Sequence, residues 1–389
     1  MKIMNEKIKK ISVLVFLMFM TVSFTGCLNL TKKEEDKKVV VNDHQGVFKS
    51  VDGGKTWEHK IEVEGGGLID NVKISSMVMD PNNNNILYLG TASNGLYKSE
   101  NGSGSWKKVT DENDILSETI VINDIAIERG NSNVIYLATL NNGRGELLKS
   151  EDGGKSWNKS HIIAQAGKAV TAVEIDPIFN NIVYIGTEEI QGGFLKSKNS
   201  GEDWIVLHWF DVGVKSILID FRNSQGIIIR TANNIFKSVN GGTEWESLAT
   251  NIVSSSKTKI NFAIISSVTM DNHNSLVIYI NYLNLILKTE DGGETWERIN
   301  TPTPSKTAVG TIPQIKQIGI INNIIYYGAG NVLYKSDNRG VSWSSYDIPI
   351  KGDVRYTVSD YTNQDVIYVG SFYTPPPPPK KKKNPFLPF

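Results

Sequence analysis

Hydrophobic residues fall into short runs rich in Val, Ile, Leu, Tyr and Phe, with clusters of Asn, Gly and Pro between the runs. Such runs are typical of β-strands, and the clusters are typical of turns. Four kinds of run recur in a fixed order, for example ISSMVMDP (Ile74–Pro81), ILYLGT (Ile86–Thr91), GLYKS (Gly95–Ser99) and WKKVT (Trp106–Thr110). This order predicts a repeated antiparallel meander of four strands.

One octapeptide marks every repeat, because it directly follows each run that ends in Lys-Ser or Lys-Thr. Its tryptophans lie 41 to 51 residues apart, and they are seven of the eight in the chain. The seven copies are SVDGGKTW (Ser50–Trp57), SENGSGSW (Ser99–Trp106), SEDGGKSW (Ser150–Trp157), SKNSGEDW (Ser197–Trp204), SVNGGTEW (Ser238–Trp245), TEDGGETW (Thr289–Trp296) and SDNRGVSW (Ser336–Trp343).

A period of this length indicates radial or linear repetition of one unit. Four-stranded sheets repeated radially form a β-propeller, so we predict an all-β fold of seven four-stranded antiparallel blades. Only VVVN and GVFKS precede the first octapeptide, whereas VRYTVSD (Val354–Asp360) and VIYVGS (Val366–Ser371) follow the last. We expect these final strands to complete the first blade and hide its edge. Two segments, Val39–Val41 and Val366–Val369, could then supply the second strand of this blade, so one of them is surplus. Eight blades with a truncated last sheet remain the alternative.

The octapeptide has the chemistry of a tight hairpin turn. Its first Ser or Thr and its third Asp or Asn can bond turn amides, and Gly at its fifth position tolerates a positive φ. In the second copy Ser103 stands at the fifth position, so the bend there could shift by one residue. A calcium loop is disfavoured, since four of the seven copies carry neutral Asn at the third position. The tryptophan is expected to pack over the hairpin.

The octapeptide resembles the Asp-box, and the chain resembles Asp-box (BNR) propellers: sialidases, xyloglucanases, sortilin and photosystem II stability/assembly factors. The match covers about residues 39–371. The resemblance implies that the boxes lie on the face opposite any active centre, and it implies little about activity, because these proteins differ in function. The box residues are Asp52, Trp57, Asn101, Trp106, Asp152, Trp157, Asn199, Trp204, Asn240, Trp245, Asp291, Trp296, Asn338 and Trp343.

Residues 1–26 have the features of a secretory signal, with four lysines and then 14 apolar residues (Ile11–Phe24). The segment ending at Cys27 resembles a bacterial lipobox, although Phe24 stands where Leu is usual. The resemblance implies a lipid on Cys27 and an extracytoplasmic, membrane-anchored protein; an ordinary free thiol is the alternative. Residues 27–38 form a polar tether, 39–373 the propeller and 374–389 a Pro/Lys tail that is disordered or an artefact.

Composition excludes several kinds of site. The chain has 41 basic and 41 acidic residues, which argues against nucleic acid as a partner. Its single cysteine excludes an internal disulfide, and its five histidines lack zinc-binding spacing. We therefore expect a monomer with no cofactor and no metal.

A meander brings its first-to-second and third-to-fourth strand turns to one face, the box face. Its second-to-third and fourth-to-first connections lie on the other, the loop face, where a ligand site is expected. Trp209, the one tryptophan outside the boxes, stands beside His208 in a short loop and could stack on a sugar; packing between blades is the other interpretation. Arg144, Arg230 and Arg355 also map to this face and could clamp an anion, although isolated surface or salt-bridge arginines are the favoured interpretation. The Arg-Ile-Pro segment of sialidases is absent.

Glycoside hydrolysis needs two facing carboxylates. Candidates on the loop face are Asp111, Glu112, Asp114, Glu188, Glu189, Asp211 and Asp347, whereas Asp80-Pro81 and Asp176-Pro177 are interpreted as turn formers. The favoured hypothesis is a non-catalytic binding or assembly module whose loop face meets a protein or glycan partner. The alternative is a sialidase-like or xyloglucanase-like glycoside hydrolase.

Overall fold

The computed structural model describes residues 45–257, 259–302, 315–321, 324–350 and 352–372, all within one compact unit, Asn42–Phe389. For 315–321 and Phe372 only the backbone is described. The predicted signal, tether and tail, with Cys27 and Val39–Val41, lie outside the described residues. In the part of the chain that is described, no helix is long and apolar enough to cross a membrane.

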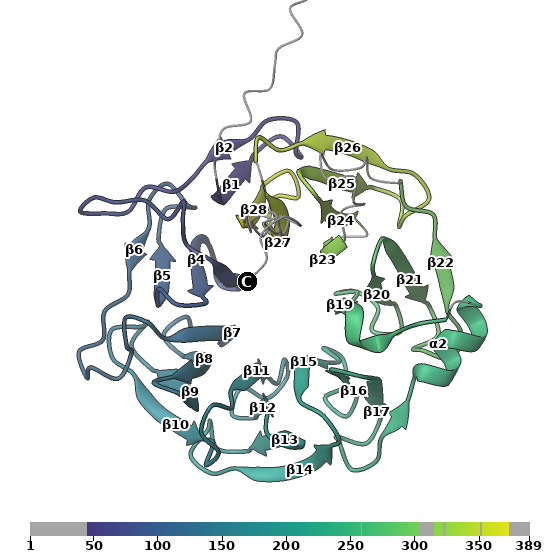
Figure 1. The fold of residues 1–389 in the computed structure, drawn as a ribbon, viewed down its shortest axis with the longest axis horizontal. Helices are drawn as coiled ribbons and strands as arrows, with labels where there is room; N and C mark the ends of the chain where they lie inside the picture. Colours follow the sequence, from purple (N-terminus) through teal and green to yellow (C-terminus); the bar gives the residue numbers. More distant parts are fainter. Residues whose placement is uncertain (1–44, 258, 303–314, 322–323, 351, 373–389) are drawn as a thin grey trace, which may run out of the picture. The chain divides into compact units, whose positions relative to one another are not determined.

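Seven four-stranded antiparallel sheets surround a common centre (Figure 1). Each innermost strand contacts the innermost strand of the next sheet, and β27 contacts β3, so the ring is closed. The prediction of a seven-bladed propeller is confirmed, and the eight-bladed alternative is wrong. We number the blades from the one that contains β1, so that blade 2 runs from β3 to β6 and blade 7 from β23 to β26.

The strands of each blade run outwards from the centre. The innermost strands are β27 (Asp353–Ser359), β3 (Ile74–Asp80), β7 (Val121–Ile127), β11 (Val170–Ile175), β15 (Val214–Ile219), β19 (Ile265–Met270) and β23 (Ile315–Ile321). The second strands are β28 (Ile367–Phe372), β4 (Asn83–Thr91), β8 (Ile135–Asn141), β12 (Val183–Thr187), β16 (Ile227–Thr231), β20 (Ile278–Tyr282) and β24 (Ile324–Ala329).

In each blade the outermost strand is no longer than the third strand. The third strands are β1 (Gly46–Ser50), β5 (Leu96–Ser99), β9 (Arg144–Ser150), β13 (Gly192–Ser197), β17 (Ile235–Ser238), β21 (Leu285–Thr289) and β25 (Val332–Ser336). The outermost are β2 (Glu58–His59), β6 (Lys107–Lys108), β10 (Asn158–Ile162), β14 (Ile205–Phe210), β18 (Glu246–Ser247), β22 (Glu297–Ile299) and β26 (Ser344–Asp347).

Blade 1 is assembled from both ends of the sequence. Its strand order is β2-β1-β28-β27, and β1 pairs with β28 along its whole length, from Gly46 opposite Ser371 to Ser50 opposite Ile367. The final strands therefore complete the first sheet, as predicted, and β28 supplies its second strand. This closure removes two sheet edges that would otherwise be open to other chains.

The octapeptide turns share one hydrogen-bond pattern. In all seven, the hydroxyl of the first residue accepts the amide of the fifth at 2.7–2.9 Å. The side-chain oxygen of the third residue accepts the amide of the seventh at 2.8–3.0 Å. Asp and Asn do this equally, because only one acceptor oxygen is needed. In the second box Ser103 itself adopts φ 67°, so the bend does not shift.

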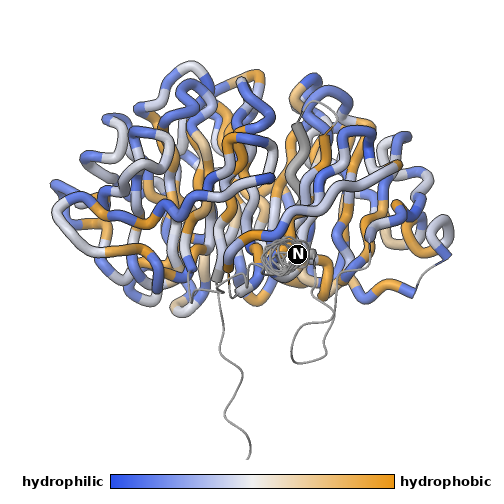
Figure 2. Tube along the Cα trace, turned by 90° about the horizontal axis from the view of Figure 1, so that it is seen from above, coloured by the Kyte–Doolittle hydropathy of each residue, from blue (hydrophilic) through white to orange (hydrophobic). Residues whose placement is uncertain are grey.

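The core lies within the blades and between them. Figure 2 shows apolar positions along the strands and polar ones mainly in the turns at the two edges. Among the box tryptophans, Trp106, Trp157 and Trp296 are buried between neighbouring blades. The other four are half-buried, namely Trp57, Trp204, Trp245 and Trp343. The box indole is therefore fully interior in three of the seven copies.

One connection contains helices that the sequence analysis did not predict. Between blades 5 and 6 lie α2 (Ala249–Ser256) and a 3-10 turn, η1 (Phe262–Ile264). The side chain of Ile252 is fully buried against Leu248 and the core of blade 6, and Lys257 ends α2 in the left-handed conformation. This tertiary anchor stabilises a helix too short to persist alone.

Replacing Asp152 by asparagine is expected to change the free energy of unfolding by less than about 1 kcal/mol. Its Oδ1 accepts the amides of Lys155 and Ser156, and the amide oxygen of asparagine can accept the same bonds. Asp152→Ala, which removes the acceptor, should cost more, about 1–3 kcal/mol. Urea unfolding of the two variants checks this; equal losses would mean that the acceptor contributes nothing.

Candidate functional site

The innermost strands share an irregularity close to their first residues. In each, the pairing with the second strand shifts at the same place, as between Val170 and Ala172 in β11. Such a shift is a β-bulge, which leaves one residue unpaired and re-aims its side chain. Outside β23, whose side chains are not described, the bulge residues are Ser75, Asn123, Thr171, Lys215, Ser266 and Arg355.

Three bulge side chains link neighbouring blades. The Ser75 hydroxyl donates to the carbonyl oxygen of Ile122, the Asn123 amide donates to that of Val170 at 2.8 Å, and the Thr171 hydroxyl donates to that of Val214 at 2.6 Å. Each accepting residue directly precedes the bulge residue of the next blade. The links therefore tie blades 2 to 5 together around the centre of the ring.

Where the bulge residue is a cation, a different side chain makes the link. From blade 5, Arg230 donates to the carbonyl oxygen of Ile265 in blade 6 at 3.2 Å. From blade 1, the Tyr356 hydroxyl donates to the carbonyl oxygen of Ser75 in blade 2. Lys215 and Arg355 are thereby not required for this contact between blades.

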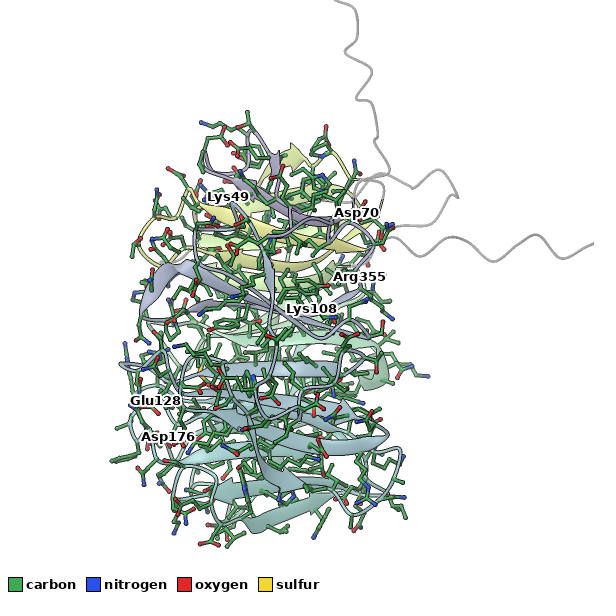
Figure 3. The ribbon with its side chains drawn as sticks, turned by 90° about the vertical axis from the view of Figure 1, so that its left-hand side faces the viewer. Lys49, Asp70, Lys108, Glu128, Asp176 and Arg355 are labelled. Atoms are coloured by element: carbon green, nitrogen blue, oxygen red, sulfur yellow. The ribbon has the colours of Figure 1, made fainter. Side chains whose placement is uncertain are left out.

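The bulge residues line a pocket of about 370 Å³ at the centre of the loop face. We call it the channel pocket. Its charged side chains are Lys215, Arg230, Arg355 and Asp124. Figure 3 shows Arg355 on the opposite side of the ring from Glu128 and Asp176, which belong to the box face. The remaining lining is neutral and mostly hydroxyl or amide: Ser75, Asn123, Thr171, Ser216, Ser266, Ser267 and Tyr356.

The cations of the channel pocket differ in how well they are compensated. Lys215 pairs with Glu188 at 3.1 Å, and Arg355 lies 3.8 Å from Asp353. Arg230 makes no ion pair with any side chain that the structure describes. Burial lowers the pKa of Arg230 to about 10, which still leaves the guanidinium charged at neutral pH.

Two carboxylates of the inner strands were missed by the sequence analysis. Asp124 in β7 accepts the amides of Ile125 and Val173, and burial raises its pKa to about 6. Burial and the charge of Asp124 raise the pKa of Glu174, in β11, to about 8. The sequence does contain a signal for inner-strand polar residues of this kind, because pairs of adjacent polar residues interrupt several innermost strands, as in Asn123-Asp124.

The Asp124→Asn variant should gain stability relative to the unmodified protein as the pH rises. Between the ordinary pKa near 3.8 and the folded value near 6, folded Asp124 keeps a proton that the unfolded chain has released. Rising pH therefore lowers the stability of the unmodified protein through this window. Urea unfolding at pH 4 to 8 should show a growing advantage of the variant.

The matched control is Asp52→Asn. Hydrogen bonds from the side chain and amide of Thr56 hold the pKa of Asp52 at about 2. Its contribution is lost only as the pH falls from about 4 towards 2, so its effect should be constant from pH 4 to 8. A constant difference for Asp124→Asn as well would contradict the prediction.

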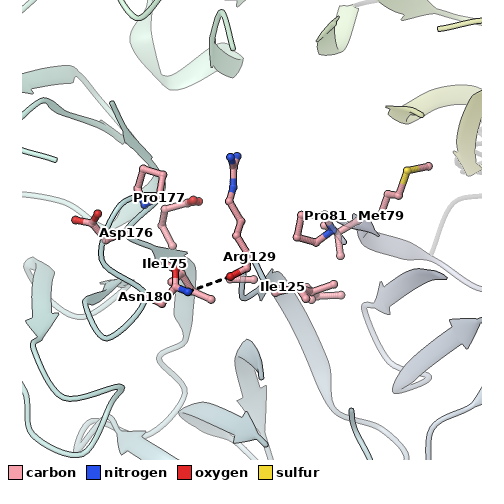
Figure 4. A pocket seen from close by; sticks show the side chains of 12 residues that line it. Met79, Pro81, Ile125, Arg129, Ile175, Asp176, Pro177 and Asn180 are labelled. Carbon is pink, nitrogen blue, oxygen red and sulfur yellow. Dashed lines mark hydrogen bonds between the residues drawn. The ribbon is translucent and has the colours of Figure 1, made fainter. Parts of the chain in front are cut away.

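A smaller pocket of about 200 Å³ lies at the box-face end of the inner strands (Figure 4). Its lining includes Arg129, Glu174 and Asn180, and the Asn180 amide donates to the carbonyl oxygen of Arg129 at 3.0 Å. Asp80 and Asp176 each accept an amide of the turn that follows, at 2.8 and 2.9 Å, as expected of turn formers.

The structure separates the five predicted binding residues. Arg230 and Arg355 line the channel pocket, whereas Arg144 is exposed at the tip of the β8–β9 hairpin and does not. His208 and Trp209 belong to the outer strand β14, so the prediction of a loop there is wrong. The His208 ring packs on Phe210 at 4.6 Å, and Trp209 remains 44% exposed.

None of the carboxylates proposed from the sequence lines the channel pocket. Asp111 accepts amides of its own loop and that of Trp157, at 3.1 Å, so it fastens a connection to the next blade. Glu188 forms an ion pair with Lys215, which lines the channel pocket, and Glu189 accepts a hydrogen bond from the Thr187 hydroxyl at 3.4 Å. The others are exposed: Glu112, Asp114, Asp211 and Asp347. In the described ranges no three His, Cys, Asp or Glu side chains group as metal ligands.

Comparison with known sequences gives one family. The model described as photosynthesis system II assembly factor YCF48 matches residues 196–375, slightly under half of the chain. The search of curated proteins finds no match.

Solved structures share the fold at low identity. YCF48 from Cyanidioschyzon merolae has a TM-score of 0.58 at 13% identity, covering 77% of this chain and 96% of its own. YCF48 bound to D1 peptide has 0.55 at 13%, covering 78% and 94%. The GH74 xyloglucanase from Xanthomonas campestris has 0.59 at 13%, covering 77% and 51%.

This chain spans about half the length of that xyloglucanase, which is consistent with one propeller. At 13% identity these likenesses concern the fold alone. The repeated turn, the closed ring and the family match nevertheless agree with one another. Residues 196–375 therefore match the YCF48 family model, and the chain as a whole has the fold of a seven-bladed β-propeller with seven Asp-box-like turns.

Proposed function

We propose that the chain is a non-catalytic binding or assembly module that presents its loop face, with the channel pocket at the centre, to a protein partner. The observation that carries the proposal is the character of this pocket. Three cations and several hydroxyl and amide groups surround one carboxylate, Asp124. This lining suits recognition of a polar partner, whereas glycoside hydrolysis requires two facing carboxylates.

The sequence match supports the same proposal. Residues 196–375 resemble YCF48 assembly factors, and one structure of such a protein is bound to D1 peptide. Surface loops on a rigid ring are also common positions for binding residues. A photosystem as the partner itself has no support in the residues of this chain.

Site-specific photocrosslinking in cells tests which face meets the partner. A photoreactive residue at Ile190, 81% exposed on the loop face, should give a discrete protein adduct. The matched control is Val341, 84% exposed in a box turn. An adduct from Val341 alone, or from neither position, would contradict the proposal, as would binding of purified chain to a glycan array without any protein adduct.

We further propose that a lipid on Cys27 tethers the chain outside the cytoplasmic membrane. The support is the segment before Cys27, with its lysines, its apolar run and its small residues Thr25 and Gly26. Cys27→Ala should release the protein from the membrane fraction and abolish labelling by a clickable fatty acid. Ser23→Ala serves as the control, and unchanged labelling of Cys27→Ala would contradict the anchor.

A glycoside hydrolase is the second candidate. It is favoured by Asp124 and Glu174, two carboxylates with raised pKa values in neighbouring inner strands, since such tuning is common at catalytic acids. A screen of xyloglucan and sialylated substrates tests it, with Asp124→Asn and Glu174→Gln as variants. Turnover that either change abolishes, while Asp111→Asn and Asp211→Asn retain it, would establish the hydrolase and overturn the binding module.

A further inference from the structure

The cations of the channel pocket are only partly compensated by carboxylates. Arg230 and Arg355 approach it from blades 5 and 1, and Lys215 approaches from blade 5. Lys215 is paired with Glu188 and Arg355 only loosely with Asp353, at 3.8 Å. Among the described residues of the lining Asp124 is the only carboxylate, so these side chains carry more positive than negative charge.

The hydrogen-bonding capacity of these cations is also largely unused. A guanidinium has five N–H donors, and the bond of Arg230 to Ile265 uses one. The Nε atoms of Arg230 and Arg355 and the hydroxyl of Ser216 are buried without a hydrogen-bond partner among the described residues. Leaving a buried cation without an opposite charge is energetically costly, whereas an oxyanion would supply both charge and acceptors.

The bulge residues Lys215 and Arg355 differ from the neutral bulge residues in their contacts with the next blade. At the other bulges with a described link, a neutral side chain is engaged with the next blade, whereas in blades 5 and 1 the bulge residues Lys215 and Arg355 are not engaged in this way. Neither side chain is held by the contact between blades, and both line the pocket. Its volume, about 370 Å³, lies in the range of small-ligand sites, roughly 300–1,000 Å³.

We propose that the channel pocket is an oxyanion-binding site in which Arg230 and Arg355 hold one carboxylate or phosphate group, with Lys215 and Ser216 beside it. This inference rests on the proposed function and names the chemical group of the partner that the loop face receives. The group is either the free carboxyl end of a peptide or a free phosphate. Planar guanidinium groups bind both with paired hydrogen bonds.

Binding to the purified full chain distinguishes the two sources. The probes are inorganic phosphate, titrated against chloride at equal ionic strength, and a short peptide with a free carboxyl end or an amidated one. Saturable binding of phosphate alone points to a free anion, and binding of the free-acid peptide but not of its amide points to a chain terminus. Absence of binding by either probe would overturn the proposal.

Matched arginine variants test the residues. Arg230→Gln and Arg355→Gln should each weaken binding roughly tenfold or more, because each removes charge-assisted hydrogen bonds. Arg144→Gln, on the same face but outside the pocket, should leave the affinity unchanged. An equal loss in all three variants would mean general charge attraction and overturn the site. If Arg230→Gln fails to fold, Arg355→Gln alone tests the site, because the Arg355 side chain is one-third exposed.

Failure of this inference can be told apart from failure of the proposed function. Crosslinking from Ile190 reports contact of the loop face with a protein, whatever group the channel pocket binds. Adducts that persist without any oxyanion binding would overturn the site and leave the binding module intact. Loss of the adducts in Arg355→Gln, but not in Arg144→Gln, would support both.

Discussion

Trp157→Ala is expected to lower the free energy of unfolding by about 3–5 kcal/mol, as for other truncations of buried aromatic residues. The indole is fully buried in a cluster that joins Leu96 of blade 2 to Leu148 of blade 3, and its N–H donates to the carbonyl oxygen of Gly154 at 3.2 Å. Alanine would leave a cavity that two rigid sheets cannot close. Urea-induced unfolding, followed by fluorescence of the remaining tryptophans, measures the loss.

The matched control is Trp343→Ala in the seventh box. That indole is half-buried and donates to Asn300, at 3.0 Å, from an exposed position. Trp343→Ala should therefore lower the free energy of unfolding clearly less than Trp157→Ala does. An effect of Trp157→Ala within about 0.5 kcal/mol of zero, the range of ordinary surface changes, would show that the buried indole does not stabilise the interface between blades.

Ending the chain after Ile350 should abolish cooperative folding. The change removes β27 and β28 and leaves blade 1 as the short hairpin of β1 and β2, and two-stranded hairpins are marginal at best. It also removes the buried side chains of Val354, Ile367 and Val369 from the core of this blade. The edge of β1 would be free to pair with other chains.

Thermal melts followed by circular dichroism, together with size-exclusion chromatography, test this expectation. The truncated chain should aggregate or melt without a cooperative transition. The control ends after Tyr373 and so removes only the predicted tail, and it should melt like the full chain. A monomeric truncated protein with an unchanged transition would contradict the importance of the closure.

The number of blades could be predicted from the sequence because each box is a local structure. The turn bonds that form it join residues no more than four positions apart, as from Asp52 to Thr56 and from Ser50 to Gly54. The same local chemistry must therefore recur wherever the fold repeats. Closure was also predictable, because the strands missing at one end of the sequence are present at the other.

The positions of the candidate site residues could be predicted only in part, because alternation along a strand does not reveal a bulge. Asp124 and Lys215 stand in strands whose pairing shifts by one residue, and the shift depends on the partner strands β8 and β16. The length of β14 likewise depends on its pairing with β13, so a segment that resembled a loop became a strand carrying Trp209.

The sequence by itself determined the repeating sheet, its box turns, the closure of the ring and the face on which Arg144, Arg230 and Arg355 lie. Only the tertiary structure decided which of these arginines line the same pocket. Distance from the ring axis depends on the strand that carries a residue: Arg355 is on an innermost strand, Arg230 on a second strand and Arg144 at the start of a third. A binding pocket requires convergence of charges from separate blades, and local sequence does not encode that convergence.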